Sequence, residues 1–381
     1  MLPLKQTQAV ISTYAADVSG VCSALYELGG MTVMHDASGC NSTYNTHDEP
    51  RWYDRDSLVF ISALSEMEAI MGDDEKLISD ITETALNLNP AFIAIAGTPI
   101  PTMTGCDIPA VARAVEHRTG IPSFGFNTNG MRSYAAGAGE ALCAYAERFV
   151  KDADKKIKNG VNVLGVTPLD FSVNGSEKSI SEVLCNAGFK VIGTWAMGCT
   201  PQELECAACA EVNLAVSASG IETAKYFFKK YGIPYVVGTP YGGFADTVVS
   251  SLKKAVKTGK NIISFADFIP DKNASAIIIG ESVMSRSLAA AVYNNYGIKS
   301  RVICPLEKID GILSENDIYA DAEIDIENAL LSATAVTADP LYKPIVKRGC
   351  KFYPLAHEAF SGRIFRKNIP NLINFKKESE K

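Results

Sequence analysis

The chain has 381 residues, of which 47% are hydrophobic and 21% charged, a composition typical of a globular protein with two or three domains. Its net charge of −7 and its pI of about 5.3 argue against a large phosphate-binding surface, so we expect no nucleic acid partner. No apolar run approaches the roughly 18 residues that span a bilayer, and the start of the chain lacks a signal-peptide pattern, so we expect a cytoplasmic protein with no membrane partner.

Apolar strands and amphipathic helices alternate along the chain. Before residue 150 the sequence predicts strands at 31–38, 58–62, 91–99 and 121–129 and helices at 66–89, 107–120 and 135–150. The charged stretch 151–160 marks a domain boundary. It is followed by strands at 161–170, 189–197, 213–219 and 233–240 and helices at 179–187, from about 200, 221–232 and 245–259. A third set has strands at 274–282, 299–305 and 332–339 and a helix at 284–297.

This alternation implies right-handed crossovers between parallel strands. The sequence therefore predicts an α/β fold of three Rossmann-like domains, with parallel sheets covered by helices on both faces. We place them at 1–150 (the expected iron–sulfur-binding domain), 161–265 and 274–350, and expect 351–381 to pack back on the first. Neither nucleotide fingerprint is present, since the nearest match to a phosphate loop, Gly259-Lys260, fails at the next position.

Two segments of the first domain carry a family resemblance. HDASGC (35–40) ends a predicted strand, and SALSEMEAIMGDDEKLI (62–78) follows it. The pair resembles the nitrogenase component 1 family, where H-x-x-x-G-C precedes a T/S-D-x-x-E-x-D-x-x-F-G-G-x-x-K-L segment. This family of nitrogenase-like oxidoreductases includes molybdenum–iron protein subunits, protochlorophyllide reductase catalytic subunits and Ni-sirohydrochlorin a,c-diamide reductive cyclase. Further similar segments are GTPIPTMTGCDIPAVA (97–112), GTPYGGFADT (238–247) and FYPLAHEAFSGR (352–363).

The resemblance implies an enzyme that is one half of a two-component system. It would pair as a homodimer or as a heterodimer with a similar subunit, and receive low-potential electrons from a separate iron-protein-like ATPase. That partner agrees with the missing phosphate loop. The bound substrate, for which a tetrapyrrole is plausible, would lie in the crevice between the three domains. The alternatives are a scaffold for assembling a metal cofactor and a non-catalytic subunit of a heterodimer.

The ten cysteines are not expected to form disulfides in the cytoplasm, so they are core residues, redox thiols or metal ligands. Cys22 and Cys40 match the family's cluster-binding cysteines, and two thiolates from each of two chains would suit one 4Fe–4S cluster at the dimer interface. The family's third cysteine falls on Thr98, and a larger cluster would have to recruit Cys106. The competing interpretation is that Cys22 and Cys40 are small buried core residues.

A second group, Cys199, Cys206 and Cys209, contains a C-x-x-C pair on a predicted helix. It could bind metal or act as a redox pair, or its cysteines could simply line a tightly packed helix. His357 is the candidate catalytic residue, although a lone histidine is more often structural. Ser217 stands near the position of the family's cofactor cysteine, so we expect no molybdenum–iron cofactor bound in the usual way.

Overall fold

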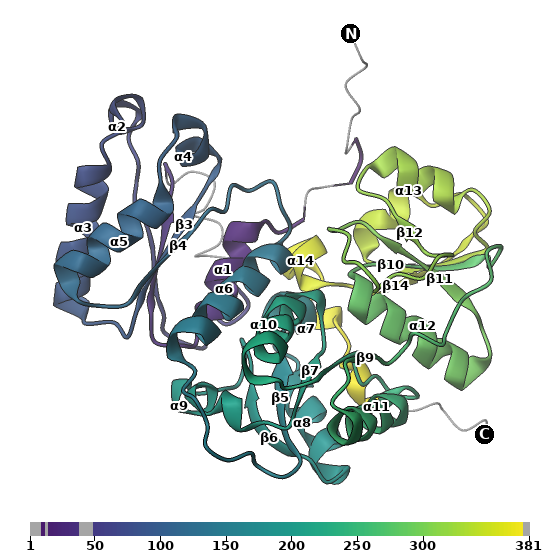
Figure 1. Cartoon of the computed structure of the whole chain (residues 1–381). Helices are drawn as coiled ribbons and strands as arrows, with labels where there is room; N and C mark the ends of the chain where they lie inside the picture. The colour runs from purple at the N-terminus through teal and green to yellow at the C-terminus, as the bar shows by residue number, and fades with distance from the viewer. Residues whose placement is uncertain (1–8, 12–13, 38–48, 376–381) are drawn as a thin grey trace.

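The computed structural model describes residues 9–11, 14–37 and 49–375. Three parallel sheets are arranged around the centre of the molecule (Figure 1), with strand orders β2-β1-β3-β4, β6-β5-β7-β8-β9 and β12-β11-β10-β13-β14. In each sheet the first strand along the chain lies inside the sheet and the chain then extends to both sides, which is the doubly wound pattern. The predicted α/β fold with three Rossmann-like units is confirmed.

The three units have the following elements. The first has β1 (Met31–His35), β2 (Leu58–Ile61), β3 (Ile93–Gly97), β4 (Ser123–Phe126), α1 (Asp17–Leu25), α2 (Glu66–Met71), α3 (Asp74–Leu88), α4 (Pro99–Thr104), α5 (Ile108–Thr119) and α6 (Tyr134–Phe149). The second has β5 (Gly160–Leu164), β6 (Lys190–Thr194), β7 (Val212–Ala215), β8 (Tyr235–Val237), β9 (Ile262–Ile263), α7 (Pro168–Phe171), α8 (Ser176–Asn186), α9 (Pro201–Glu205), α10 (Ile221–Tyr231) and α11 (Ala245–Thr258). The third has β10 (Ala276–Ile279), β11 (Ser300–Cys304), β12 (Ile318–Tyr319), β13 (Ala335–Ala338), β14 (Lys351–Pro354), α12 (Ser282–Tyr296), α13 (Glu323–Leu330) and α14 (Glu358–Ser361).

One predicted helix is two helices in the structure. The expected helix at 66–89 divides into α2 and α3 because Gly72 adopts a left-handed conformation with φ of 65°. Asp73 then caps the new helix by accepting a hydrogen bond from the Lys76 amide at 3.2 Å. The break leaves α2 as a separate short helix at one end of the first unit (Figure 1).

The described part of the C-terminal segment 351–381, which we expected to pack back on the first unit, contacts all three units. Its first residues form β14, which satisfies the open edge of β13 through a parallel pairing in the third sheet. Farther on, the Asn371 and Asn374 side chains donate hydrogen bonds to Ser179 Oγ on α8 of the second unit, at 2.9 and 2.7 Å. The first unit is contacted through the Ala15 amide, which donates a hydrogen bond to the Ala359 carbonyl at 2.8 Å, and through packing of the Tyr14 ring on Phe360.

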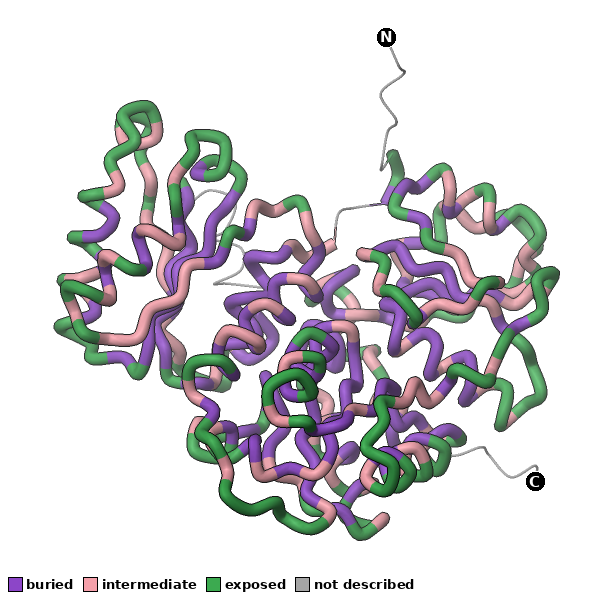
Figure 2. Tube along the Cα trace, viewed as in Figure 1, coloured by how far each residue is buried: buried purple, intermediate pink, exposed green. Residues whose placement is uncertain are grey.

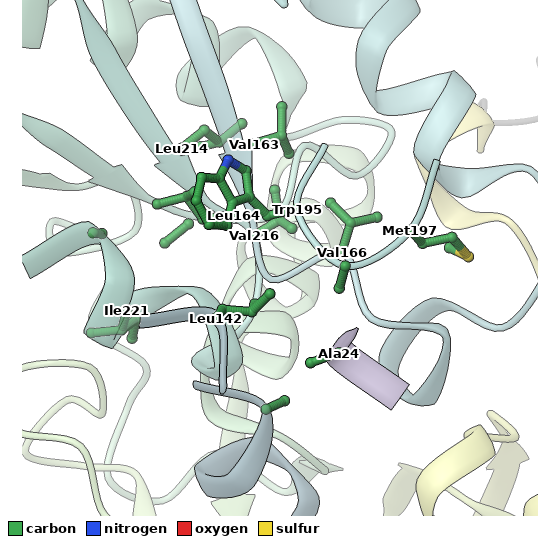
Figure 3. Packing of buried hydrophobic residues seen from close by; sticks show 14 of the residues in the cluster. Ala24, Leu142, Val163, Leu164, Val166, Trp195, Met197, Leu214, Val216 and Ile221 are labelled. Atoms are coloured by element: carbon green, nitrogen blue, oxygen red, sulfur yellow. The ribbon is translucent and has the colours of Figure 1, made fainter. Parts of the chain in front are cut away.

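The first and second units share one hydrophobic core. Helices α3 and α5 cover one face of the first sheet, whereas α1 and α6 cover the other and also pack on the second unit. In Figure 3, Trp195 lies among side chains of the second sheet, with Leu142 of α6 nearby. The colouring in Figure 2 shows the same arrangement, with buried strands and exposed outer helices. The two units are therefore fixed relative to each other by apolar packing.

The crossing of α1 and α6 depends on glycine. A Cβ atom added at Gly137 of α6 would lie 1.9 Å from the Asp17 carbonyl oxygen of α1, and one added at Gly20 would lie 2.0 Å from the Tyr134 carbonyl oxygen. Both clashes are with backbone, so the helices would have to separate. We expect Gly137→Ala to lower the Tm by roughly 5 °C or more, as measured by differential scanning calorimetry.

Gly139 on the same helix provides the matched control for this substitution. A Cβ atom there has its nearest neighbour, the Ser219 carbonyl oxygen, at 3.4 Å, an ordinary contact. Alanine at this position should leave the Tm unchanged or raise it slightly, because it favours the helix. Equal effects of the two substitutions would contradict a backbone clash as the cause.

Within the part of the chain that the structure describes, no helix combines the length and apolar character needed to cross a membrane.

Candidate functional site

Cys22 lies on α1 with its side chain completely buried in the core shared by the first two units. Burial strongly raises the pKa of its thiol, and the nearby Glu49 carboxylate raises it further. Glu49 directly follows the segment that contains Cys40, which lies outside the described residues. Cys22 offers the sulfur donor that a soft metal centre needs, but its protonated thiol is packed as a core residue in the described part of the chain.

Thr98 and Cys106, the other two positions considered for the predicted cluster, have different surroundings from Cys22. Thr98 is fully buried at the end of β3, and its hydroxyl donates hydrogen bonds to the His35 carbonyl at 2.8 Å and to Asp36 Oδ1 at 3.0 Å. Cys106 packs against the core on the opposite face of the first sheet from Cys22. Burial, aided by a hydrogen bond with Asp74, raises the pKa of Cys106 to about 12. The structure thus separates Cys106 from Cys22 by the sheet.

A buried ion network next to Cys22 was not predicted. The Arg51 guanidinium contacts Glu49 Oε1 at 2.6 Å and Glu27 Oε1 at 2.9 Å, and it donates a hydrogen bond to the Ser23 carbonyl at 2.7 Å. Its side chain and both carboxylates are almost entirely buried. The network ties the residues after the Cys40 segment to α1.

The second predicted group is only partly brought together. Cys199 is buried, with Glu27, Glu203 and Arg51 as its charged neighbours, and burial raises its thiol pKa to about 12. Cys206, which is exposed, and Cys209, which is half-buried, lie together in a 3-10 turn rather than on the predicted helix, because α9 ends at Glu205. Among the described residues, no three His, Cys, Asp or Glu side chains are arranged to hold a metal ion.

Asp170 lies where the three units meet, and it is completely buried. It accepts hydrogen bonds from the Tyr134 hydroxyl of the first unit at 2.6 Å and from Thr167 Oγ1 at 2.7 Å. His357, from the C-terminal segment, places Nε2 3.8 Å from Asp170 Oδ1. Burial raises the pKa of Asp170 to about 6, against the opposing effect of these hydrogen bonds.

Glu281 of the third unit is the second buried acid at this junction. Its carboxylate caps α12 by accepting hydrogen bonds from the amides of Val283 at 2.8 Å and Met284 at 2.9 Å. Burial, followed by repulsion from Asp170, raises its pKa to about 7. Burial therefore raises the pKa of both Asp170 and Glu281, which we call the central acid pair, and the pKa of Glu281 lies close to neutral pH.

A pocket of about 390 Å³ opens beside the central acid pair and is lined by all three units. Glu281 and Ser282 form one wall, and α6 contributes small residues that leave space. Its charged side chains are Glu222, Lys225, Glu281 and Glu307. The wall residues follow parallel strands such as β7, β10 and β11, which is where ligands of doubly wound sheets bind.

His357 lies next to this pocket without lining it. Its ring stacks on Phe360, with the ring centroids 4.7 Å apart, and neither ring nitrogen has a hydrogen-bond partner among the described residues. Burial lowers the pKa of His357 to about 4, so the ring is neutral at physiological pH. Ser217 also lies at the junction, where its hydroxyl donates to the Gly165 carbonyl at 2.7 Å.

The central acid pair makes stability depend on pH in a defined direction. Both acids hold protons more tightly in the folded protein than in the unfolded chain, where a carboxyl pKa is about 4. As the pH rises from the unfolded pKa of about 4 toward the folded values of about 6 and 7, the unfolded chain loses its protons first. The contribution of the pair to folding stability therefore decreases with rising pH. Glu281→Gln removes part of this effect. The free energy of unfolding of the variant, minus that of wild type, should therefore rise by on the order of 2 kcal/mol from about pH 4.5 to about pH 7.5.

Thermal unfolding of the two proteins across this pH range checks the prediction. His357 titrates in both, so its contribution cancels in the difference. Glu307→Gln, a half-buried acid on the same pocket wall, is the control and should show a smaller change. A wild-type-to-Glu281→Gln difference that does not vary with pH would refute a protonated Glu281.

One exposed apolar surface stands apart from this junction. It is formed by Met67, Ile70 and Met71 of α2 with Ile100 and Met103 of α4, and we call it the methionine surface. Met71 is 73% exposed and Met103 is 87% exposed. Figure 1 shows α2 and α4 side by side at one end of the first unit. Clustered exposed apolar side chains of this kind mark protein interaction sites.

Sequence reasoning missed the central acid pair, Tyr134 and Arg51. The signal for the pair was present, because Asp170 and Glu281 each follow the first strand of their own sheet, at its carboxyl end. Arg51 gave no such signal, since its partners are known only once α1 has been packed.

The comparisons with known proteins all identify nitrogenase-related proteins. The family model described as "Nitrogenase component 1 type Oxidoreductase" matches residues 19–277. The "Nitrogenase iron-molybdenum cofactor biosynthesis protein NifE" of Clostridium pasteurianum is 30% identical over 356 residues, which are 83% of this chain and 76% of the relative. The protein of the same description from Methanosarcina barkeri is 30% identical over 198 residues, 48% of this chain and 42% of the relative.

A nitrogenase chain and a solved structure match as well. The "Nitrogenase molybdenum-iron protein alpha chain" of Clostridium pasteurianum is 27% identical over 203 residues, 52% of this chain and 37% of the relative. The chain thus aligns with less than half the length of this relative and of the Methanosarcina one. The structure "Nitrogenase Cp1 at pH 6.5" superimposes with a TM-score of 0.66 at 16% identity, covering 97% of this chain and 91% of that one, which shows a shared fold.

Proposed function

The chain belongs to the nitrogenase component 1 type oxidoreductases, and we propose that it is the iron–sulfur reductase of a two-component system. It accepts low-potential electrons from an ATP-hydrolysing iron protein and reduces a substrate bound in the pocket between the three units. The observation that carries this proposal is the central acid pair, in which Glu281 lines that pocket with its pKa raised to about 7 and Asp170 is the second buried acid of the junction.

Cys22 and Cys40 would hold a 4Fe–4S cluster together with the same residues of a second subunit. Two thiolates per chain and a twofold axis supply about four ligands, the number that such a cluster needs. When bound, the cluster supplies electrons one at a time at low potential. The match of Cys22 and Cys40 to the family's cluster-binding cysteines supports this assignment, whereas the complete burial of Cys22 is what the core-residue interpretation expects.

The residues of the junction would handle the protons that a reduction consumes. Glu281 forms part of the pocket wall, and Asp170 behind it is hydrogen bonded to the Tyr134 hydroxyl at 2.6 Å. An acid with a pKa near the working pH can give up a proton and regain it. His357, whose Nε2 is 3.8 Å from Asp170 Oδ1, would remain neutral beside this acid without taking its proton, because burial lowers the pKa of the ring to about 4.

The lining charges also narrow the substrate class. Glu222 and Glu307 outnumber Lys225 even when Glu281 is protonated, so this wall favours a neutral or positively charged part of a substrate over a carboxylate. A tetrapyrrole would have to turn a face without carboxylate groups toward it.

The test is ATP-dependent turnover with an iron protein from the same organism, dithionite and a cell extract as the source of substrate. If this chain is a reductase, the complete mixture should hydrolyse ATP continuously through the iron protein and consume dithionite. Mixtures that lack any one component should do neither. ATP hydrolysis by this chain alone would contradict the proposal. So would the absence of turnover with an extract in which the complex isolated from the organism is active.

Assembly of a metal cofactor is the second candidate function, because the similarity to the NifE protein of Clostridium pasteurianum extends over most of the chain. A scaffold would acquire iron beyond the Cys22 and Cys40 cluster when it is expressed with cofactor-building proteins, and would lose it to an acceptor protein. It would show no sustained dithionite consumption.

The methionine surface would dock the iron protein. Introducing glutamate at both Met71 and Met103 places two charges in an apolar contact, which should weaken docking by at least roughly 30-fold. Analytical ultracentrifugation or pull-down with the iron protein measures this. Leu86→Glu, an exposed apolar position near the far end of α3, is the control and should bind normally. Unchanged docking of the double variant would exclude this surface.

A further inference from the structure

Cys206 and Cys209 lie in a 3-10 turn that directly follows α9. The Cys209 amide donates a hydrogen bond to the Cys206 carbonyl at 2.9 Å, which closes the turn. In such a turn the Cα atoms of residues i and i+3 are less than about 7 Å apart and the two side chains eclipse. A disulfide needs Cα atoms roughly 4.4–6.8 Å apart, so the turn already has the backbone spacing of a disulfide.

The two thiols differ in exposure, and each has a lysine beside it. Cys206 is exposed and Cys209 is half-buried. Lys151 forms an ion pair with Glu205, and Cys206 is a smaller cause, after Glu205, of the raised pKa of Lys151. An ammonium group beside a cysteine attracts an anionic disulfide, such as glutathione disulfide, to that sulfur.

The turn also holds the segment that joins the first two units. The Lys151 amide donates to the Glu205 carbonyl at 3.0 Å, and the Ile157 amide donates to the Cys209 carbonyl at 2.8 Å. The Lys156 ammonium donates to the Ala208 carbonyl at 2.8 Å, and among the charges near it is the Cys209 thiol. Segment 151–157 is thus fastened to the backbone of the turn, with a lysine close to each sulfur.

We propose that Cys206 and Cys209 are a reversible dithiol–disulfide pair that exchanges with disulfides in solution, such as glutathione disulfide. The Cys206 thiolate attacks the disulfide and releases one thiolate, which forms a mixed disulfide. The Cys209 thiolate then attacks the Cys206 sulfur and releases the second thiolate. Two protein thiols are oxidised, one disulfide is reduced to two thiols, and the two protons pass to the leaving groups. This site is independent of the predicted cluster and of the pocket.

The sequence around the pair allows a direct test on the full-length protein. After equilibration with reduced and oxidised glutathione, free thiols are alkylated and the protein is cleaved after glutamate, which releases fragment 206–211 with these two cysteines alone. The fragment should change from two alkyl groups to an internal disulfide as the oxidant increases. Fragment 183–203, which contains Cys185 and Cys199, should keep both alkyl groups under the same conditions.

Variants distinguish a built pair from two ordinary thiols. Cys206→Ser should leave Cys209 alkylated, and Cys209→Ser should trap glutathione on Cys206. Lys151→Gln should slow oxidation by roughly two- to tenfold, whereas Lys155→Gln, an exposed lysine on the same segment, should not. Fragment 206–211 that keeps two alkyl groups or gains two glutathiones would overturn the proposal, as would a tightly bound zinc ion that protects both thiols.

Discussion

Cys22→Ser will purify anaerobically with less than roughly a tenth of the wild-type iron and will show no ATP-dependent turnover. Serine has almost the size of cysteine, so the core around α1 should keep its packing. The oxygen is a poor ligand for this type of cluster, which requires soft sulfur donors. Because a twofold interface repeats each contact, one substitution removes two ligands from every cluster.

The dimer should weaken together with the iron, since ligand bonds that cross an interface contribute to assembly. Cys40→Ser should behave in the same way. Cys304→Ser, at a cysteine buried in the third unit, is the matched control and should retain full iron. Cys106→Ser should also retain it, because the first sheet separates Cys106 from Cys22. Iron analysis and sedimentation velocity give both readouts, and loss of iron in the Cys106 variant alone would reject the two-cysteine assignment.

Asp170→Asn should lower turnover about 100-fold while leaving the iron content unchanged. The amide keeps an acceptor oxygen for the Tyr134 hydroxyl, so the junction should stay folded, but it cannot exchange a proton. Removing a group that takes part in proton transfer typically costs a factor of this size. Steady-state turnover with the iron protein, together with iron analysis, separates a proton effect from loss of the cluster.

Two further variants serve as controls for the Asp170→Asn result. Glu323→Gln changes a buried carboxylate that accepts hydrogen bonds from the amides of residues 9–11 and does not line the pocket, so it should leave turnover unchanged. Tyr134→Phe keeps Asp170 but removes one of its donors, and should shift the pH dependence of turnover more than its maximum. Normal turnover of Asp170→Asn would mean that the protons come from elsewhere.

The fold was predictable because periodicity and strand endings are local properties. The alternation of apolar strands with amphipathic helices identified three parallel sheets, and the motifs at 35–40 and 62–78 identified the family. The elements that were missed are short or depend on their neighbours. β9 and β12 have two residues each, too few to show a period, and β14 is a strand because β13 offers it an open edge.

The centre of the molecule was less predictable because its parts come from distant segments. Tyr134, Asp170, Glu281 and His357 belong to three units and the C-terminal segment, and spacing along the chain does not show that they meet. The raised carboxyl pKa values are a consequence of burial, which only the packed structure provides. The C-x-x-C pair was visible in the sequence, but its turn and its attachment to segment 151–157 were not.

The most direct measurement is iron and acid-labile sulfide analysis of the anaerobically purified protein, combined with electron paramagnetic resonance after dithionite reduction. The account predicts about four iron and four sulfide ions per two chains, and the signal of one reduced 4Fe–4S cluster that is absent from the Cys22→Ser and Cys40→Ser variants. Protein that is dimeric and folded but free of iron, or iron that persists in both variants, would contradict it.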